Sequence, residues 1–331
     1  AGMFQPGTPC AQAGTYTNVW TVTDDCGNTS TTFTQVITIR DTQAPTWTTI
    51  AGSLDRTVEC SDAAGLSNAQ TLAPMASDNC DMTLTPVKNP GSPVQGTPPC
   101  IQRETITNTW TVTDDCGNTS VVYTQVITIR DSQAPTWTTV AGSLDRTVEC
   151  SDAIGLSNAQ ALAPTALDNC DPNINTQLVK TPGAFVAGML CPQEGSYTNT
   201  WTVTDDCGNT STTYTQVITI TDDTAPTAAC STSVTIFLNN MGSVSLTPAQ
   251  VNNASSDNCT APGNLVFGLS QSAFNCSHLG PNVVTLTVTD ACGNAASCTS
   301  TVTVSDNIPP VAACPMNVTQ GNDPNQCNAV V

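Results

Sequence analysis

Acidic and amide side chains gather in a five-residue segment that recurs along this chain. Asp114-Asp115-Cys116-Gly117-Asn118 returns at 24–28 and 205–209, and a divergent copy occupies 290–294. A second segment, Asp78-Asn79-Cys80-Asp81, returns at 168–171 and, in shorter form, at 257–259. Calcium takes six to eight oxygen ligands from carboxylates, amides and carbonyls. If both segments and the aspartate before each proline linker meet at one end of a domain, they offer a calcium site.

A calcium ion would remove the repulsion among carboxylates that have no basic neighbours. The candidate ligands are Asp41, Asp78, Asp81, Asp114, Asp115, Asn118, Asp131, Asp168, Asp171, Asp205, Asp206 and Asn209. Aspartate and asparagine are also ordinary turn formers, because their side chains bond their own backbone. The sequence holds no EF-hand loop and no nonapeptide calcium repeat. Calcium is therefore the one cofactor we expect, with turn formation as the alternative.

Cysteine usage indicates an exported protein stabilised by disulfides. The chain has 17 cysteines among 331 residues, at regular spacing, and cytosolic proteins rarely carry so many. No Cys-x-x-Cys pair occurs and the single histidine is His278, which argues against zinc fingers and thioredoxin-like motifs. The cysteines are therefore expected to pair with one another.

No motif in the sequence indicates catalysis. A histidine-dependent triad would have to use His278, and no Gly-x-Ser-x-Gly, phosphate loop or His-Glu-x-x-His is present. The carboxylate pair of Asp114 and Asp115 recurs at a turn, which fits architecture better than an active site. We therefore expect that the protein is not an enzyme.

The acidic turn is predicted to lie at the tip of a β-hairpin. Threonine alternates with other side chains over 105–113, which is the period of a strand buried on one face. The alternating positions are Ile106, Asn108, Trp110 and Val112. Residues 121–129 are rich in β-branched side chains and read as the second strand. Gly117 supplies the positive φ of the turn, and Trp110 is expected to anchor the hairpin in a core.

The cysteines of the acidic turns recur at a nearly constant interval of roughly 90 residues, a period that means tandem repeats. The predicted domains are the end of a repeat at 1–40 (repeat 1), whole repeats at 41–130, 131–220 and 221–305 (repeats 2, 3 and 4), and the beginning of repeat 5 at 306–331. Short strands, frequent turn signals and no convincing helical period predict an all-β chain. It is expected to form tandem immunoglobulin-like β-sandwich domains in a linear, disulfide-stabilised array. Because two strands cannot bury a core alone, we expect this chain to be a segment of a longer protein.

The formal charge of −19, from 26 acidic and 7 basic residues, excludes some classes of partner. Phosphate binding needs lysine and arginine, so nucleic acid and anionic membrane surfaces are not expected. No apolar run approaches the length that a membrane-spanning helix needs, so no membrane insertion of this segment is expected.

In an immunoglobulin sandwich, Cys80 and Cys116 fall in loops at one end of the domain, and Cys60 and Cys100 fall at the other. We therefore expect bridges within each repeat. These are Cys60–Cys100, Cys80–Cys116, Cys150–Cys191 and Cys170–Cys207. Four cysteines allow three connectivities, so Cys80–Cys100 with Cys60–Cys116 stays open. Repeat 4 has five cysteines, so Cys276 or Cys292 is expected to be free or paired outside the repeat.

Repeats 4 and 5 carry a motif series that resembles a known family. The series is Asp-Asn-x-Pro-Pro, Cys-Pro, Asp-Asn-Cys, Val-Thr-Asp-x-x-Gly-Asn and Cys-x-x-x-Val-Thr-Val. It resembles the hyalin repeat, an immunoglobulin-like extracellular module. The Trp-Thr-Val-Thr-Asp-Asp-Cys-Gly-Asn units of repeats 1–3 resemble the variant arrayed in giant surface proteins of Bacteroidota, including gliding-motility adhesins. Repeats 2 and 3 lack the first and last cysteines of the family, so the resemblance implies its bridge only for Cys230–Cys298.

The resemblance implies a structural repeat region of a long extracellular surface protein or filament, secreted by a bacterium. It would act as a stalk in adhesion or gliding motility. The expected partners are neighbouring repeats of the chain, other copies in a filament, and surface glycans or polysaccharide. One alternative is a glycan- or protein-binding module that uses the loops at 82–99 and 172–190, whose only aromatic residue is Phe185. The other alternative is a subunit of a polymeric extracellular fibre.

Overall fold

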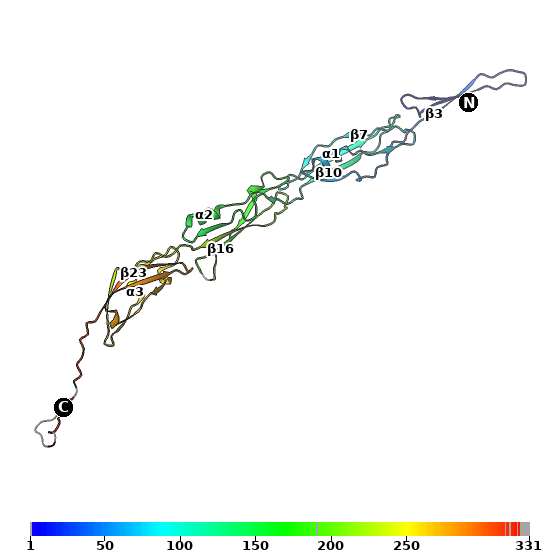
Figure 1. Ribbon diagram of the computed structural model, residues 1–331. Helices are drawn as coiled ribbons and strands as arrows, with labels where there is room; N and C mark the ends of the chain where they lie inside the picture. The colour runs from blue at the N-terminus through cyan, green and yellow to red at the C-terminus, as the bar shows by residue number, and fades with distance from the viewer. Residues whose placement is uncertain (1, 190, 315, 318, 323, 325–331) are drawn as a thin grey trace. The chain divides into compact units, whose positions relative to one another are not determined.

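The computed structural model describes residues 2–189, 191–314, 316–317, 319–322 and 324, and it is built from β-strands with short helices (Figure 1). The chain divides into two compact units. Unit 1 holds Ala1–Leu144, Ala163–Pro182 and Asn199–Gln216, and unit 2 holds Asp145–Leu162, Gly183–Thr198 and Val217–Val331. The predicted start of repeat 5, at 306–331, lies partly outside the described residues.

Repeat 1, in unit 1, forms a three-stranded antiparallel sheet. Its strands are β1 (Phe4–Pro6), β2 (Gly14–Trp20) and β3 (Phe33–Ile39), in the order β1-β2-β3. Trp20 lies opposite Phe33, so the acidic turn at 24–28 is the tip of a hairpin, as the alternation predicts. Strand β3 forms one edge of this sheet.

Repeat 2 contains an equivalent hairpin with further strands beside it, and it forms a sandwich of two sheets. The larger sheet has the order β5-β10-β9-β7, with β8 also beside β9. Its strands are β5 (Arg56–Glu59), β7 (Val87–Asn89), β8 (Val94–Gln95), β9 (Glu104–Thr111) and β10 (Tyr123–Arg130), and the smaller sheet pairs β4 (Thr46–Trp47) with β6 (Ala76–Ser77). Strand β5 runs parallel to β10, whereas β9 pairs antiparallel with β7, β8 and β10.

The core of repeat 2 confirms the predicted period of two along β9. Ile106, Asn108, Trp110 and Val112 are all buried. Trp110 is 2% exposed, and its ring lies edge-on to the ring of Tyr123, at a centroid distance of 6.2 Å. Burying aromatic and branched side chains on one face of the hairpin supplies most of the stabilisation of such a small domain.

Two polar side chains in this core are fully hydrogen-bonded. The Asn108 amide donates to the Gln125 side-chain oxygen at 2.9 Å, and the Gln125 amide donates to the carbonyls of Leu54 and Ala69 at 2.8 and 3.0 Å. Both residues have no exposed surface, so these bonds replace the water that each lost on folding. The network ties the hairpin to Leu54, just before β5, and to the segment between β5 and β6.

That segment contains a helix that the sequence interpretation did not predict. Helix α1 (Ala63–Thr71) begins after Asp62, whose carboxylate accepts the Gly65 N–H at 2.8 Å. Helix α2 (Ala153–Ala161) repeats this cap with Asp152. The prediction of no helix was wrong because each helix is short and its apolar residues form no clear stripe. Ala69, the buried residue of α1, packs on the hairpin core.

Repeats 3 and 4 follow the same plan. In repeat 3 the order is β12-β17-β16-β14 with β15 beside β16, and β11 pairs with β13. The strands are β11 (Thr136–Trp137), β12 (Arg146–Glu149), β13 (Ala166–Leu167), β14 (Leu178–Thr181), β15 (Val186–Ala187), β16 (Gly195–Val203) and β17 (Tyr214–Thr221), with a 3-10 turn at Ile174–Gln177. As in repeat 2, the first strand of the larger sheet, here β12, runs parallel to the last strand, β17.

In repeat 4, within unit 2, the order is β18-β23-β22-β20, and β19 pairs with β21. The elements are β18 (Ser233–Phe237), β19 (Ser243–Ser245), α3 (Pro248–Val251), β20 (Val266–Leu269), β21 (Ala273–Asn275), β22 (Gly280–Thr289) and β23 (Ala295–Ser305), with 3-10 turns at Pro262–Asn264 and Cys276–His278. A single apolar cluster that includes Phe274, Leu286 and Val302 fills its core.

The chain is therefore mostly β and consists of tandem β-sandwich repeats. No helix in the described part of the chain is long and apolar enough to span a membrane.

Candidate functional site

Twelve described cysteines form six disulfides, and five of these join consecutive repeats. The pairs are Cys10–Cys116, Cys60–Cys170, Cys100–Cys207, Cys150–Cys259, Cys191–Cys292 and Cys230–Cys298. The Cα atoms of the bonded cysteines lie 4.4 to 6.1 Å apart, within the usual range for a disulfide. Three of these bonds lie wholly in unit 1 and three in unit 2.

The predicted bridges within repeats 2 and 3 were wrong. Cys60–Cys100, Cys80–Cys116, Cys150–Cys191 and Cys170–Cys207 do not form, nor does the alternative Cys80–Cys100 with Cys60–Cys116. Grouping these cysteines by the end of the domain was sound. Each group faces a neighbouring repeat, however, and that repeat supplies the bonding partner.

Backbone contacts show why the neighbour is closer. Cys60 follows β5, and its N–H donates to the Arg130 carbonyl at the end of β10, where the linker to repeat 3 begins. Cys116 lies at the opposite end, in the turn whose Asn118 amide donates to the carbonyl of Asp41 in the preceding linker. A template of one isolated immunoglobulin domain contains no such neighbour.

Repeat 4 agrees with the sequence interpretation. Cys230 and Cys298 are bonded within the repeat, as the hyalin resemblance implies. Cys292 pairs outside the repeat and Cys276 is unbonded, which is one of the expected arrangements. The other unbonded cysteines among the described residues are Cys26, Cys80 and Cys314.

The acidic turn itself is held by its first aspartate. One Asp114 oxygen accepts the N–H groups of Cys116 and Asn118 at 2.9 and 2.8 Å, and the other accepts the Asn118 side-chain amide at 2.8 Å. Gly117 has φ +90°, which only glycine adopts easily. These residues therefore do form the turn, and their hydrogen bonds fix the orientation of the Asp114 carboxylate.

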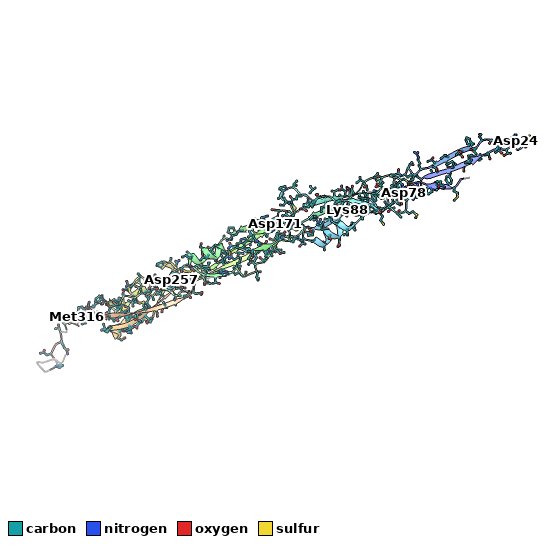
Figure 2. All side chains as sticks on the ribbon, turned by 90° about the horizontal axis from the view of Figure 1, so that it is seen from above. Asp24, Asp78, Lys88, Asp171, Asp257 and Met316 are labelled. Atoms are coloured by element: carbon teal, nitrogen blue, oxygen red, sulfur yellow. A yellow bond between two sulfur atoms is a disulfide. The ribbon has the colours of Figure 1, made fainter. Side chains whose placement is uncertain are left out.

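Two groups of three aspartates converge in unit 1. In each group, one aspartate comes from each of the three predicted locations. Asp41, Asp78 and Asp114 come from the linker, the loop and the turn, and each offers a carboxylate oxygen within 4.8 Å of the other two. Asp131, Asp168 and Asp205 form the equivalent group one repeat later. We call each group an aspartate triad. Asp78 is labelled in Figure 2, which also draws disulfides as yellow bonds.

The triads contain buried carboxylate oxygens without hydrogen-bond partners. One Asp131 oxygen accepts the Gln133 N–H at 3.2 Å, but the other is buried and unpartnered. One oxygen of Asp168 and one of Asp41 are likewise buried without a partner. Such orphaned oxygens are costly unless a cation or a proton compensates them.

A third triad in unit 2 was missed by the sequence interpretation. Asp222, Asp257 and Asp290 occupy the equivalent linker, loop and turn positions. Both Asp222 oxygens and one Asp257 oxygen are buried without a hydrogen-bond partner. The signal was present in the Asp-Asn-Cys and Asp-x-Cys-Gly-Asn motifs of repeat 4, but its altered cysteines set that repeat apart.

Burial and mutual repulsion make these carboxyls hard to ionise. Burial raises the pKa of Asp131 to about 6, and the charges of Asp168 and Asp205 add to the effect. The pKa of Asp222 is also raised to about 6, first by burial and then by the charges of its two triad partners.

The remaining predicted ligands form structural hydrogen bonds. Asp81 accepts the Thr83 N–H and hydroxyl through one oxygen and the Asp115 N–H through the other. Asp171 and Asp206 both accept the Gln177 side-chain amide. Asn118 and Asn209 hold the turns of Asp114 and Asp205. Of the predicted ligands, the triad aspartates converge and the others stabilise the surrounding loops.

An open pocket of about 530 Å³ borders the second triad, and Asp131, Asp205, Asp206 and Arg103 are among the residues that line it. A hydrated ion can therefore approach the triad from solvent.

Comparison with known proteins identifies the repeats. Residues 48–129 and 138–220 each match the family described as HYR-like domain with 4 cysteines. No curated protein sequence matches the chain.

Cadherin ectodomains are among the solved structures to which this chain is similar. Human desmocollin-1 is 11% identical, with a TM-score of 0.25, and the match covers 90% of this chain and 72% of that one. Drosophila N-cadherin EC1-4 is 11% identical, with a TM-score of 0.28 and coverage of 89% and 84%. Protocadherin gammaB7 EC3-6 is 13% identical, with a TM-score of 0.33 and coverage of 87% and 84%.

The matched segments hold four cysteines each, at 60, 80, 100 and 116 in repeat 2 and at 150, 170, 191 and 207 in repeat 3. All of these except Cys80 form inter-repeat disulfides, for which Cys10, Cys259 and Cys292 supply the other partners. The chain therefore has two tandem segments, at residues 48–129 and 138–220, that match the HYR-like domain with four cysteines.

Proposed function

We propose that this chain is a structural repeat region of a long extracellular surface protein or filament, and that it acts as a stalk in adhesion or gliding motility. Each whole repeat is one domain, at 41–130, 131–220 and 221–305, between partial repeats at 1–40 and 306–331. The proposed location is the cell surface of a bacterium of the Bacteroidota. Tandem HYR-like repeats and their disulfides support this proposal, and no catalytic activity is part of it.

The observation that carries the proposal is a short covalent route through the repeats. The route visits, in order, Cys10, Cys116, Cys100, Cys207, Cys191 and Cys292. Its two polypeptide segments, 100–116 and 191–207, are short and include β9 and β16. A strand rises about 3.3 Å per residue, which is close to the full reach of the chain. Tension would therefore load two strands and three disulfides before it unfolds a repeat.

Pulling the two ends of the full chain in a single-molecule force experiment tests this route. With disulfides intact, the segment between Cys10 and Cys292 should reach only about 110 Å, the extended length of the two short segments, because the bonds bypass the rest. After reduction, all of the chain between these cysteines can extend, to about 950 Å. Steps of about 300 Å in the oxidised chain, each the length of one unfolded repeat, would contradict the proposal.

Two double variants provide matched arms. Cys100→Ser with Cys207→Ser removes a bond on the route, and the next shortest route runs from Cys116 to Cys150 and from Cys259 to Cys292. That route contains about twice as much polypeptide, so the reach should grow by about 120 Å. Cys60→Ser with Cys170→Ser also removes one inter-repeat bond but leaves the shortest route unchanged. Equal reach in the two variants would overturn the proposed route.

We propose further that each aspartate triad binds one calcium ion. The orphaned oxygens of Asp41, Asp131 and Asp168 support this, because they are buried carboxylate oxygens directed into a cluster of like charge. Calcium tolerates flexible shells of six to eight oxygens, whereas magnesium needs a near-ideal octahedron and dehydrates reluctantly. A bound ion would offset the repulsion and join linker, loop and turn.

The proposed partners are the neighbouring repeats, other copies in a filament, and surface glycans or polysaccharide. No contact in the described residues singles out the loops at 82–99 and 172–190, so the binding-module alternative is not carried further.

A further inference from the structure

Two of the inter-repeat disulfides lie beside a pair of carboxylates. Each such group contains a Glu-Cys pair at the end of a strand, a linker aspartate and a loop cysteine. In each group every residue offers one oxygen or sulfur atom, and these four atoms lie within 4.8 Å of one another. We call each group a sulfur–carboxylate cluster. The members are Glu59, Cys60, Asp131 and Cys170 in unit 1, and Glu149, Cys150, Asp222 and Cys259 in unit 2.

The linker aspartate of each cluster is buried and has an oxygen without a hydrogen-bond partner. Asp131 is 8% exposed and one of its oxygens is unpartnered, whereas Asp222 is 2% exposed and both of its oxygens are unpartnered. The Asp222 oxygen that faces the disulfide is therefore an orphaned one. A carboxylate oxygen buried in this way is costly unless a cation or a proton compensates it.

Hydrogen bonds from neighbouring groups orient the other members of the cluster. Ser132 donates its N–H and its hydroxyl to the two Glu59 oxygens, each at 2.8 Å, and lone pairs remain on both oxygens. The Asn169 amide donates to the sulfurs of Cys60 and Cys170 at 3.6 and 3.0 Å. In unit 2 the equivalent asparagine donates to the equivalent loop cysteine at 3.2 Å. Donors of this kind orient metal ligands and favour the thiolate form of a cysteine.

The donor set of a cluster with an open disulfide suits zinc. Zinc takes four ligands in a tetrahedron, with thiolate sulfur at about 2.3 Å and carboxylate oxygen at about 2.0–2.2 Å, so two sulfurs on one ion lie about 3.8 Å apart. The Cα separations of 6.1 and 6.0 Å in these two disulfides are the widest of the six, which leaves room for that spacing. Calcium, in contrast, takes oxygen ligands.

We propose that each sulfur–carboxylate cluster binds one zinc ion when its disulfide is reduced. A phosphine reductant breaks the S–S bond: water gives its oxygen to the phosphorus and one hydrogen to each sulfur. Zinc then displaces the two thiol protons to solvent, and two thiolates and two carboxylates fill its shell. The bound ion joins the strand end and the linker to the loop of the next repeat, so the junction keeps a cross-link while the disulfide is open.

Cobalt(II) in place of zinc tests this site in the full chain, because thiolate ligands give cobalt a charge-transfer absorption that carboxylates do not. The chain is reduced with a phosphine, freed of reductant without oxygen, and titrated with cobalt and then with zinc. Cys60→Ser with Cys170→Ser should lower the absorption by one bound ion. Cys230→Ser with Cys298→Ser removes as many thiols, from the apolar core of repeat 4, and should leave the absorption unchanged.

Two carboxylate variants separate the zinc site from the calcium triad of the same junction. Glu59 is a member of the cluster and not of the triad, whereas Asp168 is a member of the triad and not of the cluster. In a reduced chain whose second cluster is removed by Cys150→Ser with Cys259→Ser, Glu59→Gln should weaken zinc binding at least about tenfold. Asp168→Asn should change zinc binding little.

Equal cobalt absorption in the Cys60/Cys170 and Cys230/Cys298 variants would overturn the proposal. Zinc affinity that is indifferent to Glu59→Gln would overturn it as well, and this result includes a reduced chain that does not fold, since unfolded thiols bind metal without the carboxylate. The oxidised chain keeps its aspartate triads in either case, so a negative result leaves the calcium proposal to its own titration.

Discussion

Asp131 shows how one residue can serve both the fold and a metal site. One of its oxygens caps the linker by accepting the Gln133 N–H, and the other is buried against Asp168 and Asp205 without a hydrogen-bond partner. In the absence of a cation this carboxyl resists ionisation, and its pKa is raised to about 6. Asp222 occupies the equivalent position one junction later, and its pKa is also raised to about 6.

The raised pKa values predict how stability depends on pH without calcium. In the unfolded chain these aspartates titrate near 3.8, so between about pH 4 and pH 6 the folded protein binds more protons than the unfolded one. The contribution of Asp131 and Asp222 to thermal stability in a chelator should therefore fall as the pH rises through this window. With calcium present the fall should be offset, so the stabilisation by calcium should be largest above pH 6.

Calorimetric titration of calcium and melting curves at several pH values check this prediction. Asp131→Asn removes one charge from a triad and should raise stability at pH 7 in chelator by about 1–3 kcal/mol, while it weakens the response to calcium. Asp223→Asn, which lies just outside a triad and is exposed, is the control. A chain equally stable at pH 4.5 and pH 7 in chelator, and indifferent to calcium, would refute the proposed metal sites.

At this scale the sequence was informative about which residues meet but not about which oxygens are free. Paired motifs of aspartate, asparagine and cysteine predicted that linker, loop and turn would converge. The sequence could not tell which of Asp78 and Asp81 would be a ligand, because both residues lie in the same turn. Only the folded loop shows that Asp81 is used up by Thr83 and Asp115.

Among the elements, the hairpin of β9 and β10 depends on a buried polar contact with helix α1. The Gln125 amide donates to the carbonyl of Ala69 in α1 and to that of Leu54, which precedes β5. The helix has one fully buried side chain, Ala69, so apolar packing alone holds it weakly.

Gln125→Ala should therefore detach α1 from the hairpin. Loss of the buried hydrogen bond to Ala69 and the cavity left beside the helix should destabilise the helix by about 2–4 kcal/mol. Amide exchange of 66–71 would then accelerate about 30- to 1000-fold, a local readout that does not require the whole chain to unfold. Thr124→Ala, the exposed neighbour on β10, should change exchange little. Unchanged protection of α1 in Gln125→Ala would contradict this account of the helix.

The strands were predictable from sequence and the helices were not, for a physical reason. Along β9 the alternation of threonine with Ile106, Trp110 and Val112 directly reflects the burial of one face of the strand. Helix α1 shows no comparable pattern in the sequence. A short helix held by a cap at Asp62 and by Gln125 needs little apolar periodicity. Its signal is the Asp62 cap, three residues before Gly65.

For the molecule as a whole, the disulfides between repeats are the main departure from what the sequence predicted. Regular cysteine spacing and the location of each cysteine at one end of a repeat could be inferred. Pairing could not, because identical repeats place equivalent cysteines in the same motif whether they bond within a repeat or across a linker. The folded chain resolves this, since Cys60 and Cys100 lie where repeat 3 begins.

The most direct measurement of this central claim is disulfide mapping of the full oxidised chain. Proteolysis without reduction, followed by mass spectrometry, should recover linked peptides for Cys60–Cys170, Cys100–Cys207, Cys150–Cys259 and Cys191–Cys292. Each of these peptides joins two repeats. Recovery of Cys60–Cys100 and Cys150–Cys191 instead would confine the bonds to single repeats and contradict the covalent route on which the proposed function rests.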